Sequence, residues 1–440
     1  MENKINILEV AKGLGIGGAE RVVQEFVFNI DKDKFNVYLG AFNDTGVRKA
    51  IIEEAGFDII KLSNDNILNV IKEYKIEVVH LHNYDPKLIE LLHGKIKIIQ
   101  THIFQNYSPL VDRNLYISKA LYNKCRHFYP LEYGVNSNII YNPCNIDAWN
   151  QNKLPQEIID GVKLNYGIKE GDFVIGRLGR SEPSKTDFLL IASVQRIAKK
   201  IPNVKFLFVG LPKLYVNILS DMPNLKGKLI FLPTTPDDYK ISRFYQTIDV
   251  FWHTASKGES FGITNVEAMI FKKPVVTHST DWNALNYKRV DNAQIEVVTN
   301  GQNGFVANYP SDIAKAMQML SMSKELRTLM GDTGYDIATE RYESTEVVGQ
   351  FESIVEDIVC ERPHGIVEDA LINNQLEKEY EENVNNVMDT TTLPHKIVYK
   401  VDKFIYKIIE FMYLVNRKIM KKVFRMDIEN RKHKKVSRWI

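Results

Sequence analysis

Residues 173–199 read FVIGRLGRSEPSKTDFLLIASVQRIAK and decide the predicted fold class. The run from Phe173 to Leu178 is short, apolar and rich in strand-forming residues, so it predicts a buried strand. The stretch from Asp187 to Lys199 has apolar residues at helical spacing. The loop between them carries two cations, Arg180 and Lys185. A strand that leads through a loop into a helix is the unit of a parallel sheet, so these cations are expected at the carboxyl edge of one.

The same alternation of strands and helices recurs on both sides of this unit. It predicts two doubly wound, Rossmann-like α/β domains in tandem, whose carboxyl-edge loops face each other across a cleft. The strands expected in the first domain are Ile5 to Val10, Asn36 to Phe42, Asp58 to Lys61, Glu77 to Leu81 and Lys97 to Thr101. Those expected in the second, besides the first strand above, are Val204 to Val209, Leu229 to Leu232, Asp249 to Trp252 and Pro274 to Thr277.

Changes in composition along the chain predict four segments. A turn-rich stretch from Tyr141 to Asp147 marks a boundary near residue 150. Residues 310–361 have the pattern of consecutive helices and are expected to close the second domain. The predicted segments are an N-terminal domain at 1–150, a second domain at 151–362, an acidic linker at 363–395 and a basic, amphipathic helical tail at 396–440.

Overall composition excludes several classes of protein. The chain has 440 residues, 44% of them hydrophobic, with 57 Lys and Arg against 55 Asp and Glu. This near balance disfavours a general nucleic-acid binder, and no nucleic-acid partner is expected. Three widely spaced cysteines argue against a disulfide framework or a zinc site. With no signal-peptide pattern at the N-terminus and no apolar run long enough to span a bilayer, the chain is expected in the cytoplasm.

The most specific motif is Gly258-Glu259-Ser260-Phe261-Gly262-Ile263-Thr264-Asn265-Val266-Glu267-Ala268-Met269. At about 100° per residue, its two glutamates lie about 80° apart around a helix. The amides around Phe261, Gly262 and Ile263 would form a helix start that attracts an anion. A glycine loop, Gly15 to Gly18, follows the first strand and would let backbone N–H groups approach an anion in the same way. Taken alone, that loop is also compatible with a simple flexible turn, and Arg180 with Lys185 is compatible with solvated loop charges.

Glu259, seven intervening residues and Glu267 resemble the E-x7-E signature of the retaining glycosyltransferases of family 4. These enzymes have the GT-B architecture of two facing Rossmann-like domains. The resemblance covers about residues 5 to 360. Its other matching segments are Gly15 to Gly18, Val79 to His82, Thr101-His102, the boundary segment at Asn142, Gly179-Arg180 with Lys185, and Asn300 to Phe305.

The resemblance implies a role for each matching residue. Arg180 and Lys185 would bind the donor diphosphate, Glu259 the hydroxyls of the donor sugar, and Glu267 the ribose. Gly17 and Gly18 would approach the phosphates or the acceptor from the N-terminal, acceptor-side domain, and Phe261, Gly262 and Ile263 would line the donor site. His102 would contact the donor sugar near the reacting centre. The catalytic set would be Glu259, Arg180, Lys185 and His102, with no metal and no cofactor beyond the nucleotide-sugar donor as co-substrate.

The sequence departs from the family pattern at three places. Thr186 stands where glycine is usual, Lys272-Lys273-Pro274 replaces a glycine before proline, and Thr280 to Leu285 lacks the familiar Gly-Gly-x-Pro-Glu loop. Because of these departures, the family pattern does not define the donor-sugar pocket of this chain. Asp31-Lys32-Asp33 is interpreted as a surface turn rather than a metal-binding Asp-x-Asp motif. His80 and His82 point to the same side of a strand, and either a structural or a functional role fits them.

The functional prediction is a retaining, metal-independent glycosyltransferase of hexosyltransferase type. It would move a sugar from a nucleotide-sugar donor to a glycan or lipid-linked acceptor in surface polysaccharide or glycoconjugate biosynthesis. The alternatives are another GT-B sugar-nucleotide enzyme, such as a phosphorylase or epimerase, and a non-enzymatic scaffold whose basic tail binds a polyanion.

The basic tail is the last feature that the sequence singles out. From Lys396 to Ile440 it has 14 Lys or Arg against 4 Asp or Glu, a net charge of +10. Apolar residues recur through it at intervals of three and four, which predicts a helix from Val398 to Phe424. Such a helix suits an anionic membrane surface, which would make the protein peripheral at the cytoplasmic face. Packing on the protein's own body, or pairing in an oligomer, are the alternatives.

Overall fold

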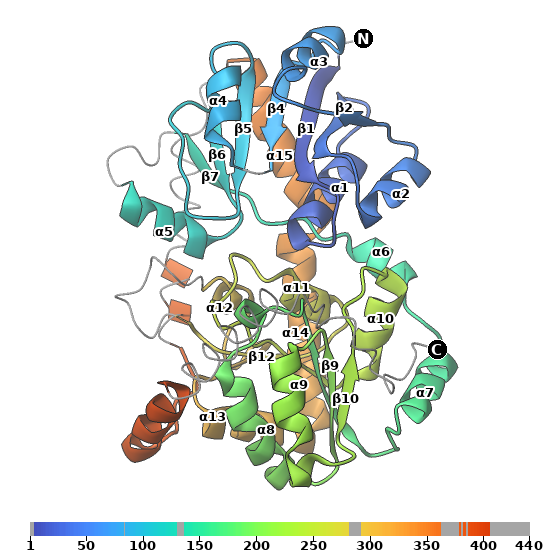
Figure 1. The fold of residues 1–440 in the computed structure, drawn as a ribbon, viewed down its shortest axis with the longest axis vertical. Coiled ribbons are helices and arrows are strands. Elements are labelled where there is room, and N and C mark those ends of the chain that lie inside the picture. Colours follow the sequence, from blue (N-terminus) through green and yellow to red (C-terminus); the bar gives the residue numbers. More distant parts are fainter. Residues whose placement is uncertain are drawn as a thin grey trace, which may run out of the picture.

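The chain folds into two α/β lobes, each built on one parallel sheet (Figure 1). The computed structural model describes residues 4–82, 84–129, 136–280, 292–361, 378–379, 382–383 and 386–404. All strand pairs of both sheets are parallel, and helices cover both faces of each sheet. The predicted fold class, two Rossmann-like domains in the GT-B arrangement, is confirmed.

The first sheet has seven strands in the order β3-β2-β1-β4-β5-β6-β7. Its order reverses direction between β1 and β4, the place where doubly wound sheets bind ligands. The strands are β1 (Ile5–Gly13), β2 (Phe35–Asn43), β3 (Ile59–Lys61), β4 (Val78–Leu81), β5 (Lys97–His102), β6 (Arg113–Tyr116) and β7 (Ser137–Ile139). The helices of this part of the chain are α1 (Gly18–Asn29), α2 (Val47–Glu54), α3 (Ile67–Glu73), α4 (Pro86–Leu92) and α5 (Lys119–Phe128).

The second sheet has six strands in the order β10-β9-β8-β11-β12-β13, and its reversal lies between β8 and β11. The strands are β8 (Phe173–Leu178), β9 (Val204–Val209), β10 (Leu229–Leu232), β11 (Val250–Trp252), β12 (Val275–Thr277) and β13 (Gly304–Val306). The helices are α6 (Ile146–Gln151), α7 (Gln156–Asn165), η1 (Pro183–Lys185), α8 (Phe188–Lys200), α9 (Lys213–Ser220), η2 (Pro223–Leu225), α10 (Asp238–Thr247), α11 (Ile263–Ile270), α12 (Gln294–Val297), α13 (Pro310–Met322), α14 (Lys324–Tyr342) and α15 (Ser344–Val359).

The predicted strands all form, and three strands were not predicted. The predicted bounds of β8, β9 and β10 are those observed. The missed strands are β6, β7 and β13. They are only three or four residues long, and β6 begins Arg113-Asn114 while β7 begins Ser137-Asn138. These residues lack the apolar run that signals a buried strand.

The last long helix, α15, corrects the interpretation that residues 310–361 close the second domain. The three consecutive helices form as expected, but α15 leaves the second lobe and packs on the first (Figure 1). Its buried side chains Val348, Phe351 and Val355 belong to one core cluster with Ile7 of β1 and Val78 of β4. An apolar helix face can pack on either sheet. The spacing of apolar residues in α15 therefore does not predict which of the two sheets the helix covers.

Two of the places where the chain passes between the lobes, near Cys144 and near Glu343, are hydrogen-bonded to each other. The N–H of Cys144 donates to the carbonyl of Tyr342 at 2.8 Å, and the N–H of Ser344 donates to the carbonyl of Cys144 at 3.2 Å. Cys144 and Glu343 form an isolated parallel bridge. This paired connection lies in the turn-rich stretch where a boundary is predicted.

The start of the basic tail is a helix that packs on the second lobe. The described part covers residues 393–404 and begins before the predicted first residue, Val398. Tyr399 is buried beside Phe188 and Tyr309. The rest of the predicted helix, and most of the predicted acidic linker, lie outside the described residues. Within the part of the chain that the structure describes, no helix has the length and apolarity needed to cross a membrane.

Candidate active site

A cleft of about 450 Å³ lies where the carboxyl edges of the two sheets meet. This volume is in the range of small-molecule sites. Segments that follow β1 and β4 line it from the first lobe, and segments that follow β8 and β11 line it from the second. These are the strands beside the two reversals of strand order. The lining includes nine of the ten predicted site residues: Gly17, Gly18, Arg180, Lys185, Glu259, Phe261, Gly262, Ile263 and Glu267.

The helix start at α11 is shaped by one glycine. Gly262 precedes the first helical residue with φ of +94°, a left-handed conformation that favours glycine. No side chain caps this helix start in the described structure, and its first residues, Ile263 and Thr264, line the cleft. The dipole of a helix start attracts negative charge. Glu259 lies in the loop just before it, as predicted.

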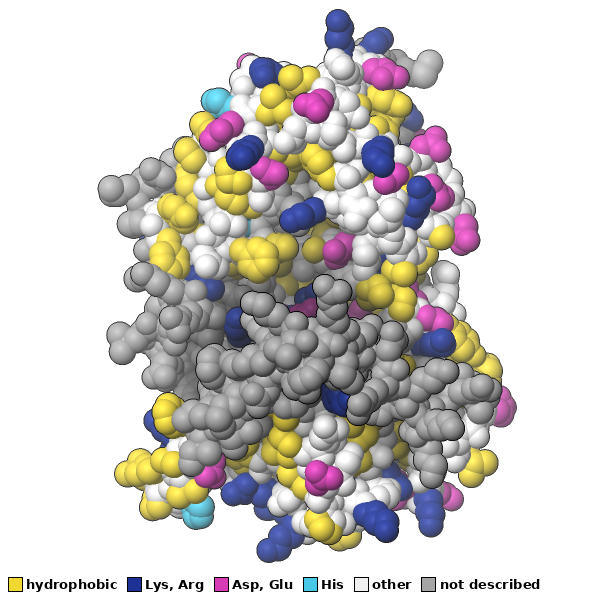
Figure 2. All heavy atoms as spheres, viewed as in Figure 1, with side chains coloured by type: hydrophobic (Ala, Val, Ile, Leu, Met, Phe, Trp, Pro, Cys, Tyr) yellow, Lys and Arg dark blue, Asp and Glu magenta, His cyan; other side chains and the backbone are white. Residues whose placement is uncertain are grey.

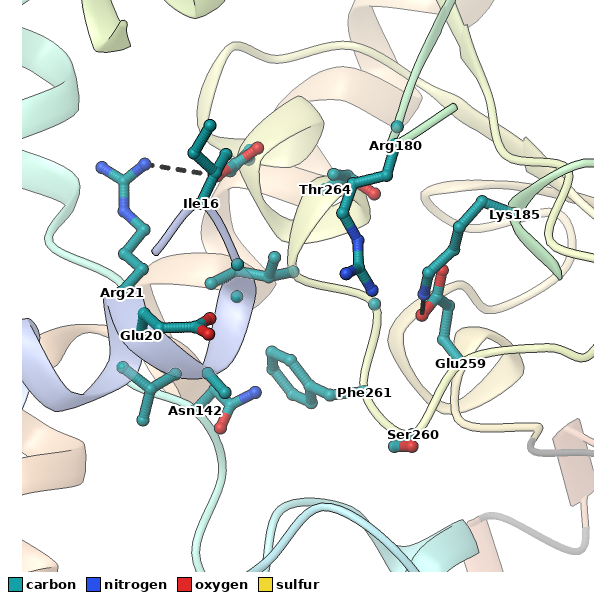
Figure 3. Close-up of a pocket in the computed structure, with 18 of the residues that line it drawn as sticks. Ile16, Glu20, Arg21, Asn142, Arg180, Lys185, Glu259, Ser260, Phe261 and Thr264 are labelled. Carbon is teal, nitrogen blue, oxygen red and sulfur yellow. Dashed lines mark hydrogen bonds and ion pairs between the residues drawn. The ribbon is translucent and has the colours of Figure 1, made fainter. Parts of the chain in front are cut away.

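Glu259 is held by two basic side chains. Its Oε2 accepts a hydrogen bond from Lys185 Nζ at 2.5 Å (Figure 3). Its Oε1 lies 3.2 Å from His253 Nε2. Burial would raise the pKa of Glu259, but His253 and Lys185 outweigh it and lower that pKa to about 2. The carboxylate is therefore ionised at neutral pH. It is an acceptor for hydroxyl groups rather than a source of protons.

The loop after β8 carries Arg180 and Lys185, the two candidates for binding phosphate, and a buried arginine holds this loop in place. The side chain of Arg180 is half exposed, pairs with Glu182 at 3.2 Å and extends into the cleft beside Lys185 (Figure 3). Beneath the loop lies Arg177, which is 2% exposed. It donates to the carbonyl of Lys185 at 2.7 Å and to Thr186 Oγ1 at 3.0 Å. The buried guanidinium thus fixes the loop that carries both cations, and Thr186 takes part in this contact.

Glu267, the second glutamate of the motif, is buried in α11. Tyr245 donates a hydrogen bond to its Oε2 at 2.9 Å, and Arg21 Nη1 lies 3.6 Å from its Oε1. Burial raises the pKa of Glu267, and the charge of Arg21 opposes that rise. Arg21 also binds Asp238 through two hydrogen bonds of 3.0 and 3.1 Å, so this arginine of the first lobe holds two carboxylates of the second.

The glycine loop of the first lobe approaches α11 directly. A Cβ added at Gly18 would lie 3.6 Å from a methyl group of Ile263, across the cleft. One added at Gly17 would overlap the carboxylate of Glu20. The starts of α1 and α11 therefore face the same space, and small residues permit this close approach.

His102 is the predicted site residue that the structure does not bring to the cleft. Among the described residues that line it, the neighbours Thr101 and Ile103 are present and His102 is not. Its ring is buried, shares a 2.8 Å hydrogen bond with Asn114 and stacks on Tyr116. Alternation along β5 explains this, because successive side chains point to opposite faces of a sheet. The prediction that His102 contacts the donor sugar is thus not supported by this arrangement.

One group of potential metal ligands exists among the described residues: Glu9, His80 and His82. Glu9 Oε2 lies 2.8 Å from His80 Nδ1 and 2.5 Å from His82 Nε2. Donor atoms on one tetrahedral metal, each at about 2.1 Å, would be about 3.4 Å apart. The observed separations are hydrogen-bond distances, so this cluster fits a carboxylate between two imidazoles. His82 lines the cleft, whereas His80 is fully buried.

Three residues with functional contacts were missed from the sequence. Arg21 lies just after the glycine loop, Arg177 lies inside a predicted strand, and His253 follows another. None of the three was predicted to belong to the site. His253 follows β11 directly, and a histidine at the carboxyl end of a central strand is a signal that could have found it. The lobe-bridging role of Arg21 has no local signal.

Comparison with solved structures shows the same architecture. A glycosyltransferase from Rickettsia africae matches with a TM-score of 0.67 and 15% identity, over 81% of this chain and 99% of that one. HepE from Anabaena, solved in complex with UDP-glucose, matches with a TM-score of 0.64 and 18% identity, over 80% of this chain and all of that one. Residues 162–336 match the family model of group 1 glycosyl transferases. Most of the second lobe is therefore similar to the group 1 glycosyl transferases.

The curated proteins that this chain resembles are distant from it in sequence. Alpha-monoglucosyldiacylglycerol synthase of Acholeplasma laidlawii is 21% identical over 63% of this chain and 65% of its own length. The capsular polysaccharide glycosyltransferase CapM of Staphylococcus aureus is 25% identical over 44% of this chain and 50% of its own length. The match thus spans less than two thirds of either relative. The 162–336 family match contains Arg180, Lys185, Glu259 and Glu267.

Proposed function

We propose that this protein is a group 1 glycosyltransferase. It transfers a sugar from a nucleoside diphosphate sugar to a glycan or lipid-linked acceptor, with retention of anomeric configuration and without a metal. The Lys185–Glu259 pair in the interdomain cleft is the observation that carries the proposal. Lys185 is a cation that can bind the leaving phosphate. Glu259, beside it, is an ionised carboxylate that can accept hydrogen bonds from sugar hydroxyls. A molecule with a diphosphate joined to a sugar matches both groups.

The leaving group defines the chemistry of the site. When the bond between sugar and diphosphate breaks, negative charge develops on the phosphate oxygen. Arg180, Lys185 and the N–H groups at the start of α11 would stabilise that charge. A site with fixed cations of this kind needs no divalent ion for the same purpose. In this proposal Glu259 orients the donor sugar.

Neither glutamate is placed to act as a glycosidase acid. Glu259 is ionised by its basic neighbours, and Glu267 is engaged by Tyr245 and Arg21. A hydrolase of sugars needs one protonated carboxyl to donate to the leaving oxygen and a second carboxylate across the bond. We assign Glu267 instead to the ribose of the donor, which would add its hydroxyls to the hydrogen bonds already made by Tyr245.

The relatives support the class of donor and the kind of acceptor. HepE was solved with UDP-glucose, which makes a UDP-sugar the first donor to test. The names of two relatives concern a diacylglycerol glycolipid and a capsular polysaccharide, so both lipid and glycan acceptors belong in the assay. The departures from the family pattern near the donor sugar call for a panel of sugars rather than glucose alone.

The test is a screen of purified full-length protein against UDP-, GDP-, ADP- and TDP-sugars, with nucleotide release measured with and without diacylglycerol or oligosaccharide acceptors. We expect one donor class to give a new glycoside whose anomeric proton signal has the donor's configuration. Inverted configuration would overturn the retaining assignment. Release of sugar phosphate, or conversion of the donor to its epimer, would instead support a phosphorylase or an epimerase.

A further inference from the structure

The helix at residues 393–404 has one face on the protein and another in solvent. On the protein side, Tyr399 is 5% exposed, and Lys403 Nζ forms an ion pair of 3.0 Å with Asp187. Asp187 caps the start of α8, directly after the loop that carries Lys185. The helix is therefore anchored to the second lobe beside the donor loop.

Its solvent face is a stripe of large apolar side chains. The stripe consists of Leu393, Ile397, Val401 and Phe404, which are 69%, 55%, 52% and 67% exposed. At about 100° per residue these four lie within an arc of about 80°. Figure 2 shows hydrophobic side chains gathered at the lower left, where Figure 1 draws this helix. A stripe of this kind on an anchored helix is a surface for contact with something apolar.

Charge identifies the kind of partner. The 36 residues after Phe404 contain 11 Lys or Arg against 3 Asp or Glu, a net charge of +8. In that sequence apolar residues continue at intervals of three and four, at Ile408, Met412, Val415 and Ile419. The partner must therefore be both apolar and negatively charged over an extended area.

We propose that the stripe at 393–404 docks the enzyme on an anionic lipid bilayer, whose negative charge complements the basic sequence after Phe404. The bilayer's acyl region would accept Ile397, Val401 and Phe404, and its anionic headgroups would accept the lysines and arginines. A second copy of this chain would instead bring two strongly basic segments together. A nucleic acid would leave the apolar stripe in water. This inference goes beyond the proposed function and holds whichever sugar is transferred.

The test is co-sedimentation of full-length protein with vesicles of phosphatidylcholine containing phosphatidylglycerol, and with vesicles of phosphatidylcholine alone. One variant carries Ile397→Ser, Val401→Ser and Phe404→Ser. The matched control carries Leu164→Ser, Met322→Ser and Leu329→Ser, three apolar side chains that are 77%, 79% and 64% exposed elsewhere on the second lobe. Since all six are exposed, both variants should fold, and thermal unfolding checks this. A single Phe404→Ser variant serves if the triple variant is unstable.

We expect wild type and control to bind the anionic vesicles, and the stripe variant to bind at least about tenfold more weakly. High salt should weaken binding of the wild type. Equal binding of stripe variant and wild type would overturn the proposal, as would equal binding of wild type to both vesicles. A wild-type dimer that the stripe variant abolishes, with no vesicle binding, would assign the stripe to a second copy. Vesicle binding needs no glycosyl transfer, so its outcome is separate from that of the donor screen.

Discussion

Arg21 of the first lobe binds Asp238 of the second through two parallel hydrogen bonds of 3.0 and 3.1 Å. The same guanidinium lies 4.5 Å from the ring centre of Trp149 and 3.6 Å from Glu267. Paired N–H groups that face a carboxylate set the orientation of both partners. One side chain thus contributes both to the contact between the two lobes and to the position of the proposed ribose-binding carboxylate.

Removing that side chain should weaken both the fold and the binding of the donor. Arg21→Ala leaves buried carboxylates without their cation, and we expect a loss of about 2–3 kcal/mol in the free energy of unfolding, below the usual 3–5 because Asp238 is partly exposed. Arg21→Lys should recover part of the stability, since a single ammonium cannot reproduce both hydrogen bonds. Chemical denaturation and the donor KM measure the two effects. The control is Arg196→Ala on the exposed face of α8, and an unchanged Arg21→Ala protein would contradict the role.

Loss of the phosphate-binding cations should slow transfer severely. For Lys185→Ala and Arg180→Ala we expect kcat to fall about 10²- to 10³-fold each, the usual effect of removing one donor to a developing charge. Lys199→Ala, an exposed lysine near the end of α8, is the matched control. Steady-state kinetics with saturating donor measure the effect. Near-normal turnover by a folded double variant would remove the diphosphate assignment.

The two glutamates should affect different kinetic constants. Glu259→Gln removes the charge that faces Lys185 and the proposed sugar hydroxyls, so we expect a large fall in kcat. Glu267→Gln acts on the ribose, which is remote from the bond that breaks, so it should raise the donor KM and the Kd for the free nucleotide more than it lowers kcat. Kinetics and calorimetric titration with nucleoside diphosphate separate these effects. The opposite pattern would exchange the two roles.

Stability should fall in acid because of the carboxylate between two imidazoles. Burial would raise the pKa of Glu9, but His80 and His82 outweigh it and lower the pKa to about 2. A lowered folded-state pKa gives stability that is complete above the unfolded value of 4.5 and is lost as pH falls toward 2. Glu9→Gln should therefore flatten the dependence of the unfolding free energy on pH in that interval. Urea denaturation between pH 5 and pH 2 tests this, with surface Glu53→Gln as the control. A variant whose stability falls as steeply as that of wild type would exclude Glu9 as the cause.

Excess EDTA should leave the rate of transfer nearly unchanged. The expectation rests on Arg180, Lys185 and the start of α11 as the groups that carry the phosphate charge. Rates before and after dialysis against EDTA give the comparison. Complete loss of activity that Mn²⁺ or Mg²⁺ restores would refute the metal-independent mechanism.

The strands and motifs that were predicted correctly from the sequence are those that depend on a local pattern of residues. Uniform apolar runs located β8, β9 and β10, and the spacing of Glu259 and Glu267 located the motif that lines the cleft. Two kinds of feature were beyond this reasoning. The Arg21–Asp238 pair joins residues 217 positions apart, and nothing in either local sequence identifies the partner. His102 matched a family motif, yet its hydrogen bond to Asn114 is a tertiary contact with a strand that was not predicted.

The return of α15 to the first lobe has a consequence for biosynthesis. The core that includes Ile7 and Val78 also needs Phe351, which a ribosome adds only after the entire second sheet has been made. The apolar surface that α15 covers on the N-terminal lobe therefore stays exposed to solvent while the second lobe is being synthesised. A gene cut near codon 150 would encode a lobe that lacks this helix, whereas supplying α15 in trans as a separate peptide should complete it.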